Sequence, residues 1–235
     1  MRLRMIAITV ALASMVAAVP AAANGGGLTT YEVTITNLAA TQPISPPVVV
    51  THERSVSFWK SGQAASDGII AIAEDGDPSV AVAALEGVAG VTDVVNVGQP
   101  LTRAGTVFDG FTDTVTITIE GYPGDRISLA GMLICSNDGF AGLDSLRLPR
   151  SHRTVEARGY DAGSEINTER SEDIVDACTD LGPVALAGDP NGNENNAVDA
   201  NGVITRHRGI VGESDLLEAH NWGRSVLRVS VAVAE

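Results

Sequence analysis

Hydrophobic and polar residues alternate with a period of two along several segments of this chain. The clearest case spans residues 114–120, where Val115, Ile117 and Ile119 would face a core and the intervening threonines would face solvent. Such alternation is typical of a half-buried β-strand. Four other segments also read as strands, the second of them short or at an edge because two prolines precede it: residues 31–36, 48–51, 127–135 and 225–233. Val and Thr dominate these segments and Gly or Pro separates them, so the pattern favours an all-β sandwich or barrel.

Residues 58–85 follow a different pattern, which predicts two short helices. Ser66 and Asp67 can cap a helix that ends near Gly76. Asp77 as N-cap with Pro78 at the first helical position then predicts a second helix through residue 85. We expect these helices to cover one edge or one face of the β-structure.

The first 23 residues have the pattern of a secretory signal peptide. Arg2 and Arg4 precede an apolar run at residues 5–19, and small residues at positions 21–23 predict cleavage after Ala23. Residues 24–30 are expected to be a flexible lead-in, and residues 31–235 a single domain. No later stretch has about 18 uninterrupted apolar residues, so no transmembrane segment is predicted. We therefore expect an exported protein, periplasmic or extracellular.

The charge of the chain is strongly negative. Its 15 basic and 29 acidic residues give a net charge of −14. Residues 1–23 hold two of the arginines and no acid, which leaves 13 basic and 29 acidic residues, a net charge of −16. Such a surface repels nucleic acid and anionic lipid, and is compatible with cations, neutral glycans or basic protein surfaces. Lys60 is the only lysine, which excludes most lysine-based chemistry.

The only two cysteines are Cys135 and Cys178. Two cysteines in an exported chain most often pair, so we expect a structural disulfide. Closing a loop of this length stabilises a fold by about 4 kcal/mol in the chain-entropy model. A reactive thiol would need a basic neighbour, and none is near in sequence.

Two acidic loops, residues 136–140 and 160–169, place oxygen donors beside glycine. Calcium takes several carboxylate and carbonyl oxygens in flexible geometry. If the loops meet in space, they form a metal site at one end of the β-domain. Asp138 and Asp161 are the leading candidate ligands, with Asn137, Glu165 and Asn167 second. The alternative for either loop alone is that its aspartate only caps a turn.

Other motifs carry less information. Residues 188–202 have oxygen donors at alternating positions but fail the EF-hand pattern, so a surface loop is the better interpretation. The four histidines show no metal-ligand spacing. His207 and His220 lie near acids in the sequence, but no nucleophile elbow accompanies them. We interpret Phe58, Trp59 and Trp222 as residues that pack in the core or at its rim. The alternative is an aromatic platform that binds a sugar or a peptide.

Several ordered motifs together are similar to the spondin N-terminal domain family, in its stand-alone bacterial form. They are the segments QPISPPVVVTH at 42–52, FW at 58–59, GQAAS at 62–66, AEDG at 73–76, NDGF at 137–140, YDAGSE at 160–165 and HRGI at 207–210. The resemblance implies a C2-like antiparallel β-sandwich with calcium bound in loops at one end. The family's DAGTD segment reads DAGSE here, which makes Asp161 a firmer expected ligand than Glu165.

The leading hypothesis is a secreted, calcium-binding, non-catalytic module for binding, adhesion or association with a matrix. Its partner would be an extracellular protein or glycan. One alternative is a secreted hydrolase with convergent His, Asp and Glu side chains. Another is a purely structural envelope protein.

Overall fold

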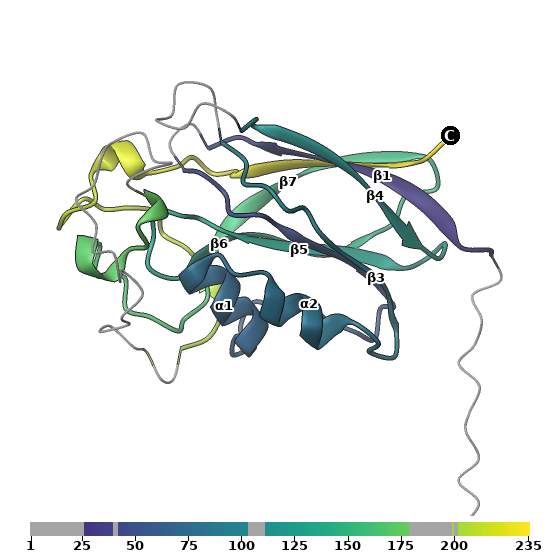
Figure 1. Cartoon of the computed structure of the whole chain (residues 1–235), viewed down its shortest axis with the longest axis horizontal. Helices are drawn as coiled ribbons and strands as arrows, with labels where there is room; N and C mark the ends of the chain where they lie inside the picture. The colour runs from purple at the N-terminus through teal and green to yellow at the C-terminus, as the bar shows by residue number, and fades with distance from the viewer. Residues whose placement is uncertain (1–25, 40–41, 103–110, 179–198, 200–201) are drawn as a thin grey trace, which may run out of the picture.

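The computed structural model describes residues 26–39, 42–102, 111–178, 199 and 202–235 (Figure 1). The predicted signal peptide and nearly all of the loop at 188–202 lie outside this range. None of the helices in the described residues is long and apolar enough to cross a membrane. The strands are β1 (Thr29–Asn37), β2 (Val48–His52), β3 (Val91–Asn96), β4 (Thr114–Gly121), β5 (Arg126–Met132), β6 (Gly139–Arg147), β7 (His152–Asp161), β8 (Thr205–Arg206) and β9 (Leu227–Val233).

All of these strands belong to one antiparallel sheet. Its order is β3-β2-β5-β6-β7-β9-β1-β4, with β8 paired to β7. Strand β7 joins the two halves, because residues 152–157 pair with β9 and residues 158–161 pair with β6. The predicted antiparallel β-structure is therefore confirmed, but the sheet is continuous and barrel-like and is not clearly the predicted C2-like sandwich.

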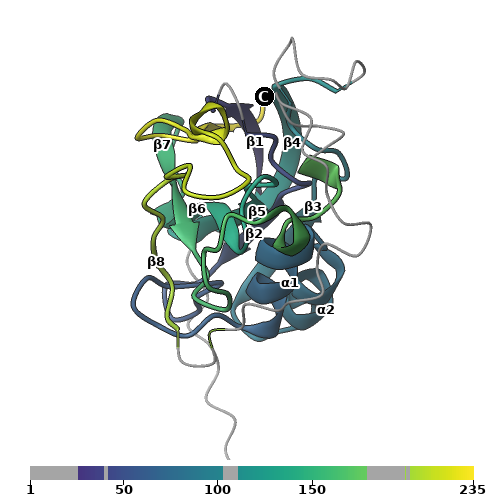
Figure 2. The same cartoon turned by 90° about the vertical axis from the view of Figure 1, so that its left-hand side faces the viewer.

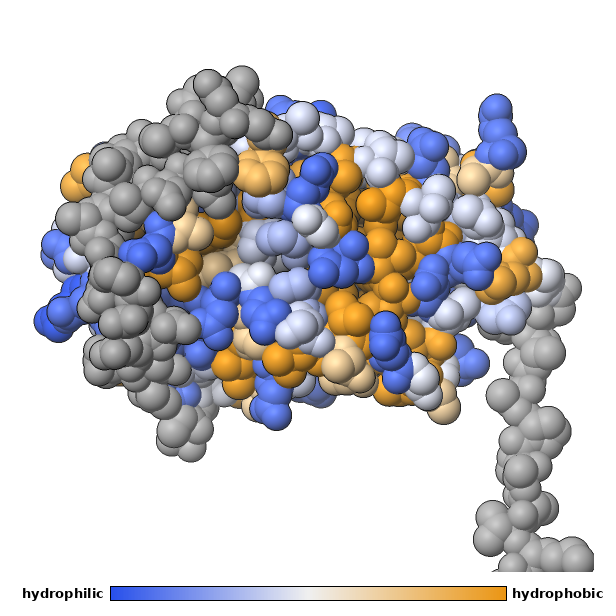
Figure 3. Space-filling model, in the orientation of Figure 1, coloured by the Kyte–Doolittle hydropathy of each residue, from blue (hydrophilic) through white to orange (hydrophobic). Residues whose placement is uncertain are grey.

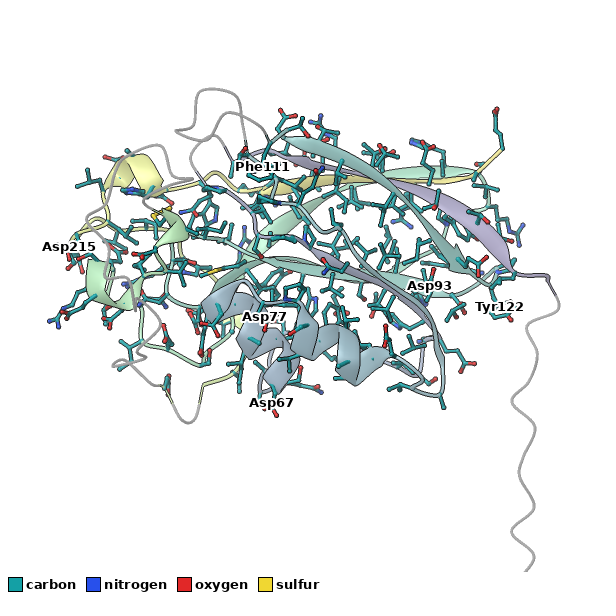
Figure 4. The ribbon with its side chains drawn as sticks, viewed as in Figure 1. Asp67, Asp77, Asp93, Phe111, Tyr122 and Asp215 are labelled. Carbon is teal, nitrogen blue, oxygen red and sulfur yellow. A yellow bond between two sulfur atoms is a disulfide. The ribbon has the colours of Figure 1, made fainter. Side chains whose placement is uncertain are left out.

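The two ends of this sheet, β3 and β4, come close to each other and nearly close the barrel. The carboxylate Oδ2 of Asp93 on β3 accepts a hydrogen bond from the backbone N–H of Glu120 on β4 at 2.8 Å (Figure 4). Thr51 on β2 donates its hydroxyl to the carbonyl oxygen of the same Glu120 at 2.5 Å. Side chains thus join the two end strands. Figure 3 shows hydrophobic side chains exposed on this face of the molecule, between hydrophilic ones.

The interior of the barrel contains the alternating positions that the sequence predicts. Val33, Ile35 and Ile119 are fully or almost fully buried there, and Val115 and Ile117 pack against the same core. Strand β2 contributes to two cores, because Val49 faces this interior while its neighbours face the helices.

Helices α1 (Asp67–Asp75) and α2 (Ser79–Leu85) pack against each other and against one face of the sheet, α1 under β5 and β6 and α2 against β3 (Figure 1). The Ser66 hydroxyl accepts the N–H of Ile69 and Gly76 ends α1 with a φ of 67°, as predicted. The predicted second helix is present, but its N-cap is Pro78 and not Asp77; the Asp77 carboxylate accepts the N–H of Ser79 at 2.8 Å just before α2. The helices cover a face rather than an edge, because their apolar side chains share a core with β2 and β5.

Loops and two short 3₁₀ helices, η1 (Ser171–Asp173) and η2 (Glu218–His220), form one end of the molecule. Figure 2 views this end, where the chain after β7 and the chain around β8 lie side by side. The Cys135–Cys178 disulfide is formed and buried here, which confirms the predicted pairing. Asp215, at the same end in Figure 4, accepts the N–H and hydroxyl of Ser171 and so fastens η1 to the C-terminal part of the chain.

Candidate metal centre

The two predicted acidic loops meet at the loop end of the barrel. One loop joins β5 to β6, and the other follows β7. Since β6 and β7 are antiparallel, the start of β6 lies beside the end of β7, and Gly139 pairs with Asp161. The carbonyl oxygen of Asp138 accepts the N–H of Ala162 at 3.0 Å, which extends this pairing into the loops.

Asp138 is fully buried where the loops meet. Its Oδ2 accepts the backbone N–H groups of Ser164 at 2.8 Å and Glu165 at 3.0 Å. Its Oδ1 is also buried and has no hydrogen-bond partner among the described residues. An orphaned carboxylate oxygen is costly to bury unless something else satisfies it.

The turn before β6 fixes the position of Asp138. The Ser136 hydroxyl donates to the carbonyl oxygen of Leu133 at 2.5 Å and accepts the N–H of Gly139 at 3.1 Å. A Cβ atom at position 139 would collide with the Ser136 hydroxyl, so glycine is required there. The Asn–Asp–Gly sequence is therefore a structural turn as well as a source of a carboxylate.

Asp161 belongs to a chain of polar contacts. Its Oδ1 accepts the N–H of Gly163 at 2.8 Å, and its Oδ2 accepts the amide of Asn167 at 2.6 Å. The Asn167 Oδ1 in turn lies 3.0 Å from His207 Nε2. Because His207 Nδ1 accepts the N–H of Gly209 at 2.9 Å, the neutral ring donates from Nε2 to Asn167. Asn167 thus positions Asp161 rather than standing free as a ligand.

Asn137 joins the two loops. Its amide nitrogen lies 3.2 Å from the Thr168 hydroxyl and 3.4 Å from the carbonyl oxygen of Asp173, and its Oδ1 accepts the N–H of Glu169 at 3.2 Å. The carboxylate of Glu169 is itself satisfied by three backbone N–H groups at residues 211–213. Both side chains therefore hold the loops together.

Three further carboxylates surround this junction. Glu165 is 5% exposed and feels the charges of Glu74, Asp138 and Asp173. Asp173, in η1, accepts the Thr168 hydroxyl through Oδ2 at 2.6 Å, while its Oδ1 is buried without a hydrogen-bond partner among the described residues. We define the acidic cluster as Glu74, Asp138, Asp161, Glu165 and Asp173. Sequence reasoning identified three of these five and missed Glu74 and Asp173.

The pKa values within the acidic cluster show the repulsion. Burial, with a smaller contribution from the Asp161 carboxylate, raises the pKa of Asp138 to about 6. Burial, followed by the charges of Glu74, Asp138 and Asp173, raises the pKa of Glu165 to about 8. The pKa of Glu74 is raised as well, chiefly by burial. Within the described residues, neither Arg170–Glu172 nor Arg228–Glu156 includes Asp138, Asp161, Glu165 or Asp173.

The carboxylates of the cluster are adjacent without forming a tight cage. Among the described residues, the ligand atoms of three His, Cys, Asp or Glu side chains lie within 4.8 Å of one another only at Cys135, Cys178 and His220. The two sulfurs there are bonded to each other, so they offer no thiolate. Drawing the acidic cluster around an ion would therefore need backbone oxygens or a small closure of the loops, which calcium's flexible coordination permits.

His52, His152 and Trp59 lie outside the acidic cluster. His52 contacts Ser128 and the Glu53 carbonyl, and His152 contacts Ser230. No histidine makes a hydrogen bond to a carboxylate side chain within the described residues. Trp59 packs in the core against Phe140 and Tyr160, as the packing interpretation expected.

The fold and the cluster define a barrel-like antiparallel β-protein with an acidic loop end. The chain matches the Spondin_N family over residues 39–177, more than half of its length, and belongs to that family. Strands β1, β8 and β9 lie outside the matched range but pair with strands inside it. No curated protein shows a significant match to the chain. Membership of the family suggests an extracellular binding module.

Proposed function

We propose that this protein is an exported, non-catalytic binding module whose acidic cluster holds a calcium ion. The observation that carries the proposal is the buried Oδ1 of Asp138, which has no hydrogen-bond partner among the described residues and lies near the carboxylates of Asp161 and Glu165. A divalent cation would offset this repulsion, satisfy the orphaned oxygens of Asp138 and Asp173, and keep the carboxyl groups ionised.

Calcium suits the cluster better than magnesium or zinc. Every member of the acidic cluster donates oxygen, and the members come from loops and a helix end that can adjust. Magnesium requires near-ideal octahedral geometry, and zinc prefers nitrogen and sulfur ligands. The end of α1 adds to the argument, because Glu74 and Asp75 lie in its last turn with no basic residue, where the helix dipole disfavours acids.

The expected role of the ion is to fasten the loops into one presented surface. The cluster connects α1, the β5–β6 turn, the chain after β7 and η1, so a bound ion would order four segments at once. A surface of this kind at one end of a rigid barrel is a typical place for recognition. We propose an extracellular protein or a glycan as the partner.

Calorimetric titration of the EDTA-treated chain with calcium tests the proposal. The wild type should bind calcium, and binding at 100 times the dissociation constant should raise the free energy of unfolding by about 2.7 kcal/mol. Asp138→Asn should weaken calcium binding by tenfold or more, since a ligand charge is lost. Asp176→Asn, which removes a charge from an exposed residue at the same end, should not. Wild-type protein that binds no calcium would contradict the proposal.

A further inference from the structure

A second cluster of charge, of opposite sign, lies beside the acidic cluster. Arg206, Arg208 and Arg224 line a pocket of about 350 Å³ with His207, Trp222 and Gly223. The volume is at the small end of the range for ligand sites. Arg206 ends β8 and Arg208 follows two residues later, whereas Arg224 comes from the segment before β9. Two segments that are distant in sequence thus place their guanidinium groups around the same pocket.

Within the described residues, these three arginines form no ion pair, although the chain has 29 acidic residues. All three are exposed. Three guanidinium groups around one hollow repel one another. Because guanidinium stays protonated at any physiological pH, the positive charge of this pocket does not depend on titration.

Trp222 and His207 form one wall of the pocket, and the indole N–H of Trp222 adds an uncharged hydrogen-bond donor. The ring of Trp222 packs against that of His207, with ring centres 4.8 Å apart. The indole N–H of Trp222 makes no hydrogen bond to another described residue. His207 is held by Gly209 and Asn167, and burial lowers its pKa to about 4, so its ring stays neutral at the mouth of the pocket.

We propose that this pocket binds the oxyanion group, a carboxylate, sulfate or phosphate, of a small ligand. The planar fork of an arginine matches the paired oxygens of such a group and donates charge-assisted hydrogen bonds to it. The indole would cover an apolar part of the same ligand. No member of the acidic cluster lines the pocket, so an anion bound there would not contact a calcium ligand.

The negative net charge of the protein helps to distinguish a specific anion site from unspecific anion binding. A chain at −14 opposes the unspecific accumulation of anions, so saturable anion binding requires a local site. A second hollow provides the matched comparison, because it is also lined by three arginines, Arg147, Arg150 and Arg153. It is about 710 Å³, with walls that include Tyr31 and Leu148, so its arginines are spread along a wider and more apolar opening.

The test is titration of the full chain in EDTA with sodium sulfate, phosphate and glucuronate, at ionic strength held constant with chloride. Tryptophan fluorescence and amide NMR shifts follow binding. At least one of the three anions should bind saturably, with shifts around residues 206–209 and 222–224. Arg206→Gln combined with Arg208→Gln should weaken binding by roughly tenfold or more for each guanidinium removed. Arg150→Gln combined with Arg153→Gln, with the same change in charge, should not.

A steric variant makes the test independent of charge. A Cβ atom at Gly223 meets no protein atom within 4 Å, so Gly223→Val should fold normally and obstruct the pocket. Gly27→Val, at another open position, is its control. The proposal is overturned if all three anions act only as chloride does, or if the variants at Arg150 and Arg153 lose binding while those at Arg206 and Arg208 keep it. Because EDTA is present throughout, a failure of the calcium proposal leaves this result unchanged.

Discussion

Asp138 has one carboxylate oxygen that accepts two backbone hydrogen bonds and one that is buried without a partner. The first oxygen explains why the residue lies where the loops meet. The second sets the chemistry, because a buried charge with an unsatisfied oxygen either takes up a proton or finds a cation. Glu165 also either takes up a proton or binds a cation. Its pKa of about 8 lies further from the ordinary range of carboxyl groups than the value of about 6 for Asp138.

Glu165 predicts how the calcium-free protein responds to pH. Its pKa is about 8 in the fold, above the ordinary value of 4.5, because of burial and the charges of Glu74, Asp138 and Asp173. The folded state therefore holds a proton that the unfolded state has lost, and this contribution to stability disappears as pH rises through about 8. In EDTA, the melting temperature should fall from pH 7 to pH 9, a range in which His207 is neutral in the folded state and mostly neutral in the unfolded state.

Matched variants identify the source of that slope. Glu165→Gln should flatten the dependence of the melting temperature on pH, whereas Glu86→Gln, at an exposed position, should leave it unchanged. Calcium should also flatten it, because the ion holds Glu165 ionised. A melting temperature that rises from pH 7 to pH 9 in EDTA would contradict the assignment.

Gly163 tests the close approach of the chain behind the site. Its φ is 71°, and a Cβ atom there would lie 2.6 Å from the backbone nitrogen of Val203. Gly62 has a similar φ of 85° but open space around it. Gly62→Ala should lower the free energy of unfolding by about 1 kcal/mol for the left-handed backbone alone. Gly163→Ala should lower it by clearly more in urea denaturation, and equal losses would show that the contact with Val203 yields easily.

At the residue scale, the site residues that could be predicted are those whose neighbours in the sequence already indicate their role. Asp138 and Asp161 stand beside glycine in polar loops, so their chemistry and their setting are both visible in a few residues. Glu74 and Asp173 are not visible in this way. Glu74 ends a helix like many surface acids, and only the packing of α1 against β5 and β6 brings it to the cluster.

Among the helices and strands, too, some could be predicted from the local sequence and others could not. The strands with strict alternation, β1 and β4, and both helices could be predicted from the sequence, as could the Ser66 cap of α1. The strands that hold the site, β6 and β7, were not predicted, because glycine and charged residues interrupt their patterns. Gly142 and Gly159 admit the rings of Trp59 and Trp222, respectively, so these interruptions serve tertiary contacts that no local pattern records.

The N-cap of α1 gives a prediction for an element. The Ser66 hydroxyl accepts the N–H of Ile69, so Ser66→Ala should lower the free energy of unfolding by about 1 kcal/mol. Ser55→Ala, at an exposed loop position, should change it by less than about 0.5 kcal/mol. Because Glu74 is on the same helix, fraying of α1 should also weaken calcium binding. Urea denaturation and calcium titration of both variants measure the two effects.

At the scale of the whole molecule, the sequence indicated β-structure but could not decide between sandwich and barrel. The periodicity of each strand shows which residues are buried and does not show which strands are neighbours. Here the decision rests on β7, whose halves pair with different strands, and on the contacts of Asp93 and Thr51 with β4. These are long-range contacts, which neither the periodicity of the strands nor the sandwich implied by the family resemblance records.

The Cys135–Cys178 disulfide and the acidic cluster constrain the same loops, which gives the last prediction. The bond joins the β5–β6 turn to the chain after η1, across a separation of 43 residues. Replacing both cysteines with alanine should lower the free energy of unfolding by about 4 kcal/mol in the chain-entropy model. Alanine is the suitable replacement because both sites are fully buried, where serine would add unsatisfied hydroxyl groups.

Calcium should compensate part of that loss, because an ion in the acidic cluster links the β5–β6 turn to η1 by a second route. At 100 times its dissociation constant, calcium should restore about 2.7 kcal/mol to the double variant, as in the wild type. Chemical denaturation in EDTA and in calcium measures both terms. If calcium stabilises the wild type and leaves the double variant unchanged, the disulfide is required to form the cluster, and the two constraints are not independent.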